Sequence, residues 1–216
     1  MVFPALFLVN LMIKTILFDF DGVILDSMKI KGDGFVELFE GYPIDAVQKL
    51  ESYHYANGGI SRFEKIQYFF NTIMDMPISD EKINTLANQF AKIIAQKLFD
   101  TKNLIADTMQ FIEKNHQKYY LYIVSGAEQN ELRTLCNIFK IDHFFEGIYG
   151  SPTPKTRLVK NILEQNHILK NEVILIGDSI NDYDAASKNG IVFFGYNNES
   201  LIEKGNYIST FKDLVF

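Results

Sequence analysis

The hydrophobic positions of this chain fall into short apolar runs separated by longer amphipathic stretches. The runs at 16–18 and 172–176 are nearly continuous, which is typical of strands buried on both faces of a parallel sheet. Further strands are predicted at 119–124, 147–150, 191–194 and 207–208. Helical stretches lie between most of these runs. The pattern therefore predicts an α/β fold with a Rossmann-like parallel sheet and helices on both faces.

A purely helical pattern occupies residues 28–99, where no strand-like run occurs. Helices are predicted at 28–40, 44–55, 62–74 and 79–98. Ser61 and Glu64 have the spacing of a capping box, which marks the start of the third helix. We therefore expect a four-helix domain at 28–99, inserted into a core domain made of residues 12–27 and 100–216.

The apolar segment at residues 1–11 belongs to neither predicted domain. It is too short to span a bilayer. It also lacks the basic start and the small-residue cleavage site of a signal peptide. Met12 stands directly before the first strand, so two interpretations stay open: either Met12 is the natural start, or the segment is a peripheral extension.

Composition narrows the classes of function. A chain of 216 residues with 47% hydrophobic and 22% charged residues is typical of a globular protein. A net charge of −6 argues against nucleic acid as the main partner, because phosphate backbones need clustered Lys and Arg. The single cysteine, Cys136, excludes an intrachain disulfide and a Cys-rich zinc site, and is expected to be a buried small apolar side chain. We expect a cytoplasmic protein with neither a nucleic-acid nor a membrane partner.

Polar side chains follow several predicted strands. In chain order they are Asp19 and Asp21, then Ser125, then Lys155, then Asp178 and Asp182. The carboxyl ends of parallel strands lie along one edge of a sheet, where open α/β sheets bind their ligands. We therefore expect these side chains to lie close together.

This combination of groups favours phosphoryl chemistry. Carboxylates hold Mg²⁺, one Asp can attack phosphorus to form an aspartyl-phosphate, and a second can protonate the leaving oxygen and later activate water. Ser125 and Lys155 can bind the phosphate oxygens. Taken singly, each residue has a simpler interpretation: Lys155 as a solvated surface lysine, and Ser125 as a helix cap paired with Glu128. The order and placement of the whole set favour the functional interpretation.

Four motifs resemble those of the haloacid dehalogenase (HAD) superfamily of phosphohydrolases. They are DFDGV at 19–23, the serine of IVSGA at 125, Lys155, and GDSIND at 177–182. The resemblance runs from residue 12 to the C-terminus. The helical insert after the first motif resembles the C1 cap of phosphoglycolate phosphatase and β-phosphoglucomutase relatives. The dehalogenases of the superfamily are thought to lack the second Asp of the first motif, so Asp21 favours phosphoryl transfer over dehalogenation.

The resemblance implies a role for each motif residue. Asp19 would be the nucleophile, and Asp21 the general acid/base that also gives its backbone carbonyl to the metal. It assigns metal binding to Asp19, Asp21, Asp178 and Asp182, phosphate binding to Ser125, Gly126 and Lys155, and catalysis to Asp19, Asp21 and Lys155. Asp182 would be either a ligand or a nearby group paired with Lys155. The cofactor implied is Mg²⁺.

Substrate selection is expected in the helical insert. Arg62, which follows a glycine-rich loop, would contact an anionic or hydroxylated substrate, or else is a solvated residue at a helix start. The stretch NGGISRFEK resembles HAD-type hydrolases of bacterial surface-polysaccharide gene clusters, so a sugar phosphate is one candidate. His54 and its two tyrosine neighbours either line the cleft or pack the helix. A phosphonatase-type enzyme would need a Schiff-base lysine in this insert, and nothing in the sequence singles out Lys65.

The function that follows is a Mg²⁺-dependent phosphomonoesterase. It would act on a small phosphorylated metabolite through an aspartyl-phosphate, as a monomer or a homodimer. Two alternatives stay open: a β-phosphoglucomutase-like phosphomutase, which would share all four motifs, and a non-catalytic binding module on the HAD fold. The intact acids argue against the binding module, since it would not need all of them.

Overall fold

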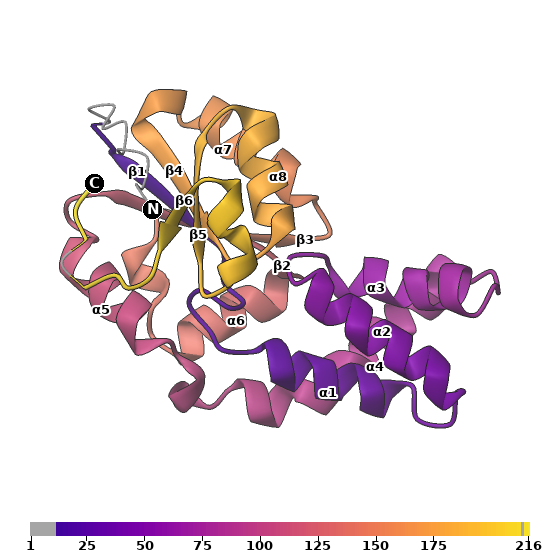
Figure 1. Ribbon diagram of the computed structural model, residues 1–216. Helices are drawn as coiled ribbons and strands as arrows, with labels where there is room; N and C mark the ends of the chain where they lie inside the picture. Colours follow the sequence, from indigo (N-terminus) through magenta and orange to yellow (C-terminus); the bar gives the residue numbers. More distant parts are fainter. Residues whose placement is uncertain (1–11, 213) are drawn as a thin grey trace, which may run out of the picture.

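The computed structural model describes residues 12–212 and 214–216, and its centre is a parallel sheet of six strands in the order β3-β2-β1-β4-β5-β6 (Figure 1). The strands are β1 (Thr15–Phe18), β2 (Tyr120–Glu128), β3 (Gly147–Ser151), β4 (Val173–Gly177), β5 (Val192–Tyr196) and β6 (Asn206–Ile208). The predicted Rossmann-like α/β fold is confirmed. The extension expected at residues 1–11 lies outside the described residues.

The order of the strands reverses beside β1. Phe18 of β1 is level with Ile123 of β2 on one side and with Ile176 of β4 on the other. After β1 the chain builds the half containing β2 and β3, and then returns to place β4 on the opposite side of β1. Open α/β sheets bind ligands at such a reversal, in the crevice beyond the carboxyl ends of the strands. The crevice beyond β1 and β4 is therefore the expected place for a site.

Helices cover both faces of the sheet, because successive strand residues point to opposite sides. Ile16 and Phe18 pack with α5 and α6, whereas Leu17 packs with α7 and α8 on the other face. These four helices are α5 (Ala106–Asn115), α6 (Gln129–Ile138), α7 (Lys155–Gln165) and α8 (Ile180–Asn189). Figure 1 shows the two pairs on opposite sides of the strands. Short 3₁₀ turns connect the elements: η2 (Thr101–Asn103), η3 (Asp142–Phe144), η4 (Lys170–Glu172) and η5 (Glu199–Lys204).

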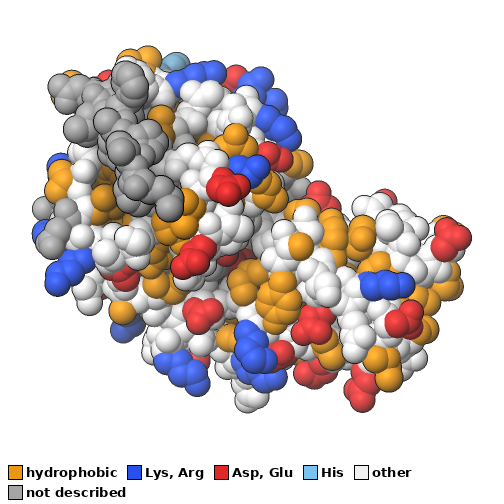
Figure 2. Space-filling view, in the orientation of Figure 1, with side chains coloured by type: hydrophobic (Ala, Val, Ile, Leu, Met, Phe, Trp, Pro, Cys, Tyr) orange, Lys and Arg blue, Asp and Glu red, His pale blue; other side chains and the backbone are white. Residues whose placement is uncertain are grey.

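Residues between β1 and α5 form a group of helices beside the sheet, called here the helical region. It consists of α1 (Met28–Leu38), α2 (Ile44–Ala56), α3 (Arg62–Tyr68), the π-helix η1 (Phe69–Ile73) and α4 (Asp80–Leu98). Its interior is aromatic: the rings of Phe39 and Phe69 stack with centroids 4.0 Å apart, and those of Phe35 and Phe90 lie 4.3 Å apart. Figure 2 shows this region as a smaller lobe, with a concave outline where it meets the larger one.

The third predicted helix differs from the structure in its second half. The capping box of Ser61 and Glu64 is present, but the α-helix ends at Tyr68 and continues as the π-helix η1. Phe69 and Phe70 are both buried in this wider turn. The hydrophobic pattern alone predicts a regular helix, because a π-turn shifts the register by only a single residue.

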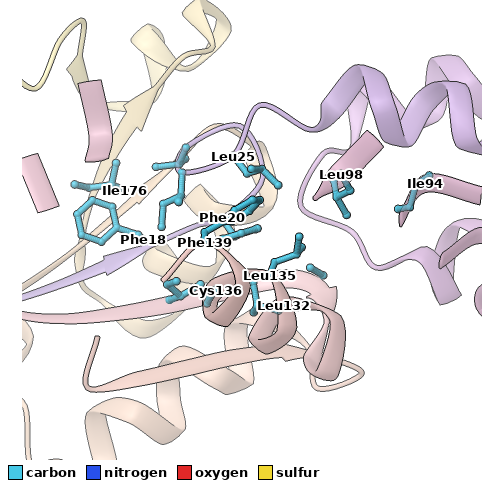
Figure 3. Close-up of a cluster of buried hydrophobic side chains, with 14 of the residues drawn as sticks. Phe18, Phe20, Leu25, Ile94, Leu98, Leu132, Leu135, Cys136, Phe139 and Ile176 are labelled. Carbon is cyan, nitrogen blue, oxygen red and sulfur yellow. The ribbon is translucent and has the colours of Figure 1, made fainter. Parts of the chain in front are cut away.

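Two adjacent chain segments connect the helical region to the sheet. Leu25 and Leu104 form an isolated antiparallel bridge, and the amide of Ile105 donates to the carbonyl of Ile24 at 2.9 Å. Phe20 and Leu25, in the loop after β1, are fully buried. In Figure 3 both side chains lie in the same apolar cluster as Leu132, Leu135 and Phe139 of the α6 region, between Phe18 of the sheet and Leu98 of α4. The hydrophobic core is therefore continuous between the sheet and the helical region.

The predicted end of the second strand was wrong. β2 continues past Val124 to Glu128, because Glu128 pairs with Ser151 of β3 after an irregularity in the register. Ser125 therefore lies within an extended segment. The capping box predicted from Ser125 and Glu128 does not form: Glu128 itself caps α6 and accepts from the amides of Asn130 and Glu131. Lys155 is the first residue of α7.

Within residues 12–212 and 214–216, no helix is both long enough and apolar enough to cross a bilayer.

The single thiol gives a direct test of the packing. Cys136 of α6 has no exposed surface, and burial raises the pKa of its thiol to about 12. Since the thiolate is the reactive form, we expect no fast reaction with a disulfide reagent in the native protein and one equivalent after unfolding in guanidinium chloride. The variant Gln89→Cys, which adds a thiol at an exposed position of α4, is the positive control. Fast native reaction of the parent protein would contradict the described packing.

Candidate active site

Three carboxylates meet at the crevice beyond β1 and β4. Asp19 directly follows β1, Asp178 directly follows β4, and Asp182 lies in the first turn of α8. One carboxylate oxygen of each lies within 4.8 Å of the others. Asp19 and Asp182 are buried, and Asp178 is partly exposed. The structure thus brings together three of the four acids predicted to hold a metal, and we call them the acid group.

Gly22 allows the loops that carry the acid group to approach one another. Its φ of +74° lies in the left-handed region, and a Cβ at this position would lie 1.9 Å from Oδ2 of Asp178. Two asparagine side chains hold the same loops: Asn197 donates to the carbonyl of Gly22 at 3.1 Å, and Asn198 to that of Asp178 at 2.7 Å. The loops after β1, β4 and β5 are therefore held together by hydrogen bonds to main-chain oxygens.

Lys155 is the one cation paired with the acid group among the described residues. Its Nζ lies 2.9 Å from Oδ2 of Asp19 and donates to Oδ1 of Asp182. Of the two alternatives given for Asp182, metal ligand or partner of Lys155, the structure shows the pairing with Lys155. Burial disfavours an ammonium, but Asp182 and Asp19 outweigh it and raise the pKa of Lys155 above its ordinary value.

The charges of the acid group are not balanced by Lys155 alone. Burial, reinforced by Asp182, raises the pKa of Asp19 to about 7. Burial and the charge of Asp19 also raise the pKa of Asp178 well above its usual range. Such shifts mean that the three negative charges repel one another in a poorly solvated place. A further positive charge would relieve this repulsion.

The donor atoms suit a divalent cation. Oδ1 of Asp19 accepts from the amide of Phe20 at 2.7 Å, but Oδ2 is buried and accepts no hydrogen bond of good geometry from the described residues. Its nearest donor, the Lys155 ammonium at 2.9 Å, is poorly aligned, so this oxygen keeps lone pairs that a ligand can use. Carboxylate oxygens are the ligands that Mg²⁺ prefers in proteins. The acid group therefore fits a hard divalent cation of this kind.

Asp182 also has a structural role. Its Oδ2 accepts from the hydroxyl of Ser179 at 2.5 Å and from the Ser179 amide at 3.1 Å, which closes the capping box at the start of α8. With Lys155 on the other oxygen, both oxygens of Asp182 already have protein donors. That Asp182 is a direct metal ligand stays a prediction, and its observed contacts are those of a residue that orients Lys155.

Asp21 is not a member of the acid group, and its hydrogen bonds are with residues at the start of the helical region. Its Oδ1 accepts from the hydroxyl of Ser27 at 2.5 Å, and its Oδ2 from Nζ of Lys31 in α1 at 2.5 Å. Burial alone would raise the pKa of Asp21, but Lys31 and Ser27 outweigh it and hold the pKa below its ordinary value. Asp21 lies outside the acid group, but its charge contributes to the raised pKa of Asp19, so the two carboxylates still act on each other electrostatically. The metal-binding role of its backbone carbonyl stays a prediction.

Ser125 and Gly126 lie at the same edge of the sheet as Asp19, because β2 is the neighbour of β1 and Ile123 is level with Phe18. The hydroxyl of Ser125 is buried and accepts from the amide of Ala127 at 3.1 Å. Gly126 approaches the helical region closely: a Cβ there would lie 2.3 Å from the carbonyl oxygen of Gly59. Phosphate binding by these residues stays a prediction.

Arg62 connects the helical region to the sheet. Its guanidinium is buried, forms an ion pair with Glu131 of α6, and lies 5.2 Å from the centre of the Phe90 ring. The interpretation of Arg62 as a solvated helix-start residue was wrong. It lines a cavity beside Asp21, so contact with a substrate stays a prediction.

The loop between α2 and α3 closes over the crevice. Asn181 of α8 donates from Nδ2 to the carbonyl of Gly59 at 2.7 Å. A pocket of about 790 Å³, counting space open to solvent, lies between this loop and the sheet; Lys155, Gly126 and Asn181 are among its lining residues. The helical region therefore forms one wall of a pocket that is also lined by Lys155, the lysine paired with the acid group.

Sequence reasoning missed two charged residues of the site, Lys31 and Glu131, and gave a third, Lys65, no role. Lys31 and Phe35 are four residues apart, so a lysine on the apolar face of the first helix was a readable signal. Lys65 is 2% exposed, and its Nζ lies 2.9 Å from Nδ1 of the buried His54. No local pattern predicts the pairing of Glu131 with a residue 69 positions away.

Comparison with known proteins shows which protein family the chain belongs to. The chain matches the haloacid dehalogenase-like hydrolase family over residues 16–196, and it belongs to that family. The resemblance inferred from the four motifs is confirmed. A parallel α/β sheet with an acid group at its topological switch point, together with this membership, defines a phosphoryl-transfer hydrolase.

Relatives with assigned names support a phosphatase. A phosphoglycolate phosphatase of Vibrio cholerae is 24% identical over 192 residues, which cover 85% of this chain and 84% of the relative. A 5′-nucleotidase of Pseudomonas aeruginosa is 29% identical over 80 residues, only 35% of this chain and 36% of that relative. The crystal structure of β-phosphoglucomutase from Clostridium difficile superposes with a TM-score of 0.74 at 20% identity, covering 95% of this chain and 94% of the other. At 20% identity, the similarity to β-phosphoglucomutase shows a shared fold only.

The buried His54 predicts how stability depends on pH. Burial, with a contribution from Lys65, lowers the pKa of His54 to about 3, below its ordinary value of 6.5. Between these values the unfolded chain binds more protons, so lowering the pH from 6.5 destabilises the folded state, by up to about 1.4 kcal/mol per pH unit for one group. His54→Gln can keep both hydrogen bonds without titrating. We expect its melting temperature to fall less steeply than that of the parent between pH 6.5 and 4.

The exposed His143 provides the matched control. His143→Gln should melt in parallel with the parent protein over the same pH range. If the His54→Gln curve were also parallel to the parent curve, His54 would not be buried as a neutral side chain.

Proposed function

We propose that this protein is a Mg²⁺-dependent phosphomonoesterase that hydrolyses a small phosphorylated metabolite through an aspartyl-phosphate on Asp19. The observation that carries the proposal is the state of Asp19 Oδ2. It is buried, accepts no well-aligned hydrogen bond from the described residues, and lies 2.9 Å from the ammonium of Lys155 inside the acid group. A carboxylate oxygen that keeps free lone pairs and lies beside a fixed ammonium can act as a nucleophile toward phosphorus.

Asp19, Asp178 and Asp182 are the side chains that would hold the cation. When bound, Mg²⁺ supplies charge neutralisation for the phosphoryl oxygens and for the acids that surround them. Lys155 adds a fixed positive charge at the same place, which stabilises the negative charge that spreads over the phosphoryl oxygens during transfer. The hydroxyl of Ser125, at the same edge, is the proposed donor to a further phosphoryl oxygen.

The reaction has two displacements at phosphorus. In the first, Asp19 Oδ2 forms a bond to phosphorus, the bond to the ester oxygen breaks, and Asp21 gives a proton to that oxygen. In the second, Asp21 takes a proton from water, whose oxygen attacks the phosphorus, and the bond to Asp19 breaks. Inorganic phosphate leaves and both carboxyl groups return to their starting state. The contact from Lys31 favours the carboxylate of Asp21, the form that the second displacement needs, so Asp21 has to take up a proton together with the substrate before the first displacement.

The helical region, residues 28–99, acts in this proposal as a cap over the site. Three contacts support the assignment: Asn181 to the carbonyl of Gly59, the ion pair of Arg62 with Glu131, and the close approach of Gly59 to Gly126. A cap that closes on the substrate excludes bulk water during the first displacement and must open for product release.

Replacement of the nucleophile should abolish turnover. We expect Asp19→Asn to lower kcat/KM for any phosphomonoester substrate by about 10³-fold or more, because the amide cannot form the phosphoenzyme. The melting temperature in EDTA should stay equal to or exceed that of the parent, since one of three repelling buried charges is removed. Phosphate release and thermal unfolding are the measurements.

Asp45, an exposed acid of α2, provides the matched control. Asp45→Asn should retain parental activity. Retention of more than a tenth of parental activity by Asp19→Asn would exclude the proposed nucleophile.

Mg²⁺ should stabilise the folded protein through the acid group. A ligand that binds only the folded state raises the free energy of unfolding by RT ln(1 + [L]/Kd), which is about 2.7 kcal/mol at a hundredfold excess over Kd. We expect saturating MgCl₂ to raise the melting temperature of the parent by several degrees relative to EDTA. Asp178→Asn should lose most of this rise, whereas Asp45→Asn should keep it. An equal rise in all three proteins would show that Mg²⁺ acts elsewhere.

The experiment that tests the function is phosphate release from phosphorylated sugars, phosphorylated acids and nucleotides, with Mg²⁺ and with EDTA. Metal-dependent release from a narrow set supports the proposal. Without release, a phosphoryl group trapped on Asp19 by a phosphoryl donor indicates a phosphomutase. The absence of both release and phosphoenzyme would overturn the proposal and favour a binding module.

A further inference from the structure

A cavity between Asp21 and the helical region has room for one water molecule. The space into which a water molecule fits there is about 20 Å³. A buried water needs about 10 to 15 Å³ of such space and two to four polar partners. Five side chains supply polar walls: Asp21, Lys31, His54, Arg62 and Lys65. The cavity is therefore too small for a leaving group of several atoms, but it suits a single bound water.

The cavity borders the segment that is proposed to bind the phosphoryl group. Asp21, the proposed base for the attacking water, forms one wall, and Gly126 and Ala127 of β2 form another. Gly126 directly follows Ser125, the proposed donor to a phosphoryl oxygen. A water molecule in this cavity would therefore have the base on one side and the phosphate-binding segment on another.

Lys65 differs from the other two cations of this cavity. Lys31 is paired with Asp21, and Arg62 is paired with Glu131. Within the described residues, no carboxylate forms an ion pair with Lys65, although the lysine is only 2% exposed. Lysine is rarely buried unless it is paired. A bound water would give the Lys65 nitrogen a further hydrogen-bond partner.

His54 fixes the direction of the Lys65 side chain. Nε2 of His54 lies 2.9 Å from the carbonyl oxygen of Met28, which can only accept, so Nε2 carries the proton. In the neutral ring Nδ1 is then an acceptor, and it receives a hydrogen bond from Nζ of Lys65 at 2.9 Å. Lys65 also lines the cavity, so its remaining N–H groups can reach a water molecule there.

Lys65 can donate to a water molecule in both of its protonation states. Burial, together with the charge of Lys31, lowers the pKa of Lys65 to about 7, so the ammonium and the amine coexist near neutral pH. The ammonium has three N–H groups and the amine has two, and His54 accepts from one of them. At least one N–H group is left for a water molecule in either form.

We propose that Lys65, oriented by His54, holds the water molecule that attacks the phosphoenzyme in the second displacement. The inference rests on the proposed phosphomonoesterase. The water oxygen accepts a hydrogen bond from Lys65, and one of its O–H groups donates to Asp21. The oxygen keeps a second lone pair, which forms the bond to phosphorus while the proton passes to Asp21 and the bond between phosphorus and Asp19 breaks.

Rapid-mixing kinetics with p-nitrophenyl phosphate and saturating Mg²⁺ separates the two displacements. The first releases p-nitrophenolate, which leaves without taking up a proton, and the second releases inorganic phosphate. We expect Lys65→Met to slow the second displacement by about tenfold or more and to change the first by less than about twofold. A burst of one equivalent of p-nitrophenolate should then precede a slow steady state.

Two further variants distinguish a role in water binding from a structural role. Lys65→Gln, whose neutral amide can still donate to a water molecule, should restore part of the rate of the second displacement. Lys82→Met, which alters an exposed lysine of α4, should behave like the parent protein. Equal slowing of both displacements in Lys65→Met, or no slowing of the second, would overturn the proposed role.

A crystal structure of the parent protein that resolves ordered waters tests the site without any turnover. We expect one water within hydrogen-bonding distance of both Nζ of Lys65 and the carboxylate of Asp21, and we expect Lys65→Met to lack it. The absence of such a water in the parent would overturn the inference. If no phosphoester were hydrolysed, the proposed function and the catalytic role of the water would both fail, whereas the crystal structure would still decide on the water site.

Discussion

Repulsion between carboxylates in the crevice beyond β1 and β4 is the interaction on which the candidate site depends. The sheet forces the contact: Asp19 and Asp178 follow neighbouring central strands, and the capping box of α8 brings Asp182 to the same point. Packing these charges together away from water costs several kcal/mol per ion unless it is offset by opposite charge. Lys155 supplies one positive charge. The fold therefore holds the three acids of the acid group close together, and binding of a further cation would stabilise this arrangement.

The helical region contributes charge of the opposite sign. Lys31, Arg62 and Lys65 all reach the cavity on its side of Asp21. Asp21 is only two residues from Asp19 in sequence, yet its contacts are with Ser27 and Lys31 rather than with the acid group. In the proposed reaction, a substrate between the two sides would have the acid group at one end and the basic side chains of the helical region at the other.

Local and topological signals in the sequence were sufficient for the sheet and the acid group. Asp19 and Asp178 could be placed because parallel strands share a carboxyl edge, and the start of α3 because the Ser61 box depends on residues three positions apart. Contacts between residues that are far apart in the sequence could not be predicted from it. The continuation of β2 depends on pairing with Ser151, and the burial of Lys65 depends on a histidine in another helix. A lysine in a helix is usually solvated, so the residue type alone predicts an exposed side chain for Lys65, which is wrong.

The hydrogen bond from Asn181 to Gly59 affects which residues of the loop between α2 and α3 can be substituted during evolution. The acceptor is a main-chain carbonyl, which every residue possesses. This docking contact therefore needs no side chain from the loop at 57–61. Position 59 itself has to stay a glycine, because a Cβ there would lie 2.7 Å from Oγ of Ser179. The residue at position 60 can therefore change while the hydrogen bond from Asn181 persists, so under the proposed function a residue near the substrate could vary without loss of this contact.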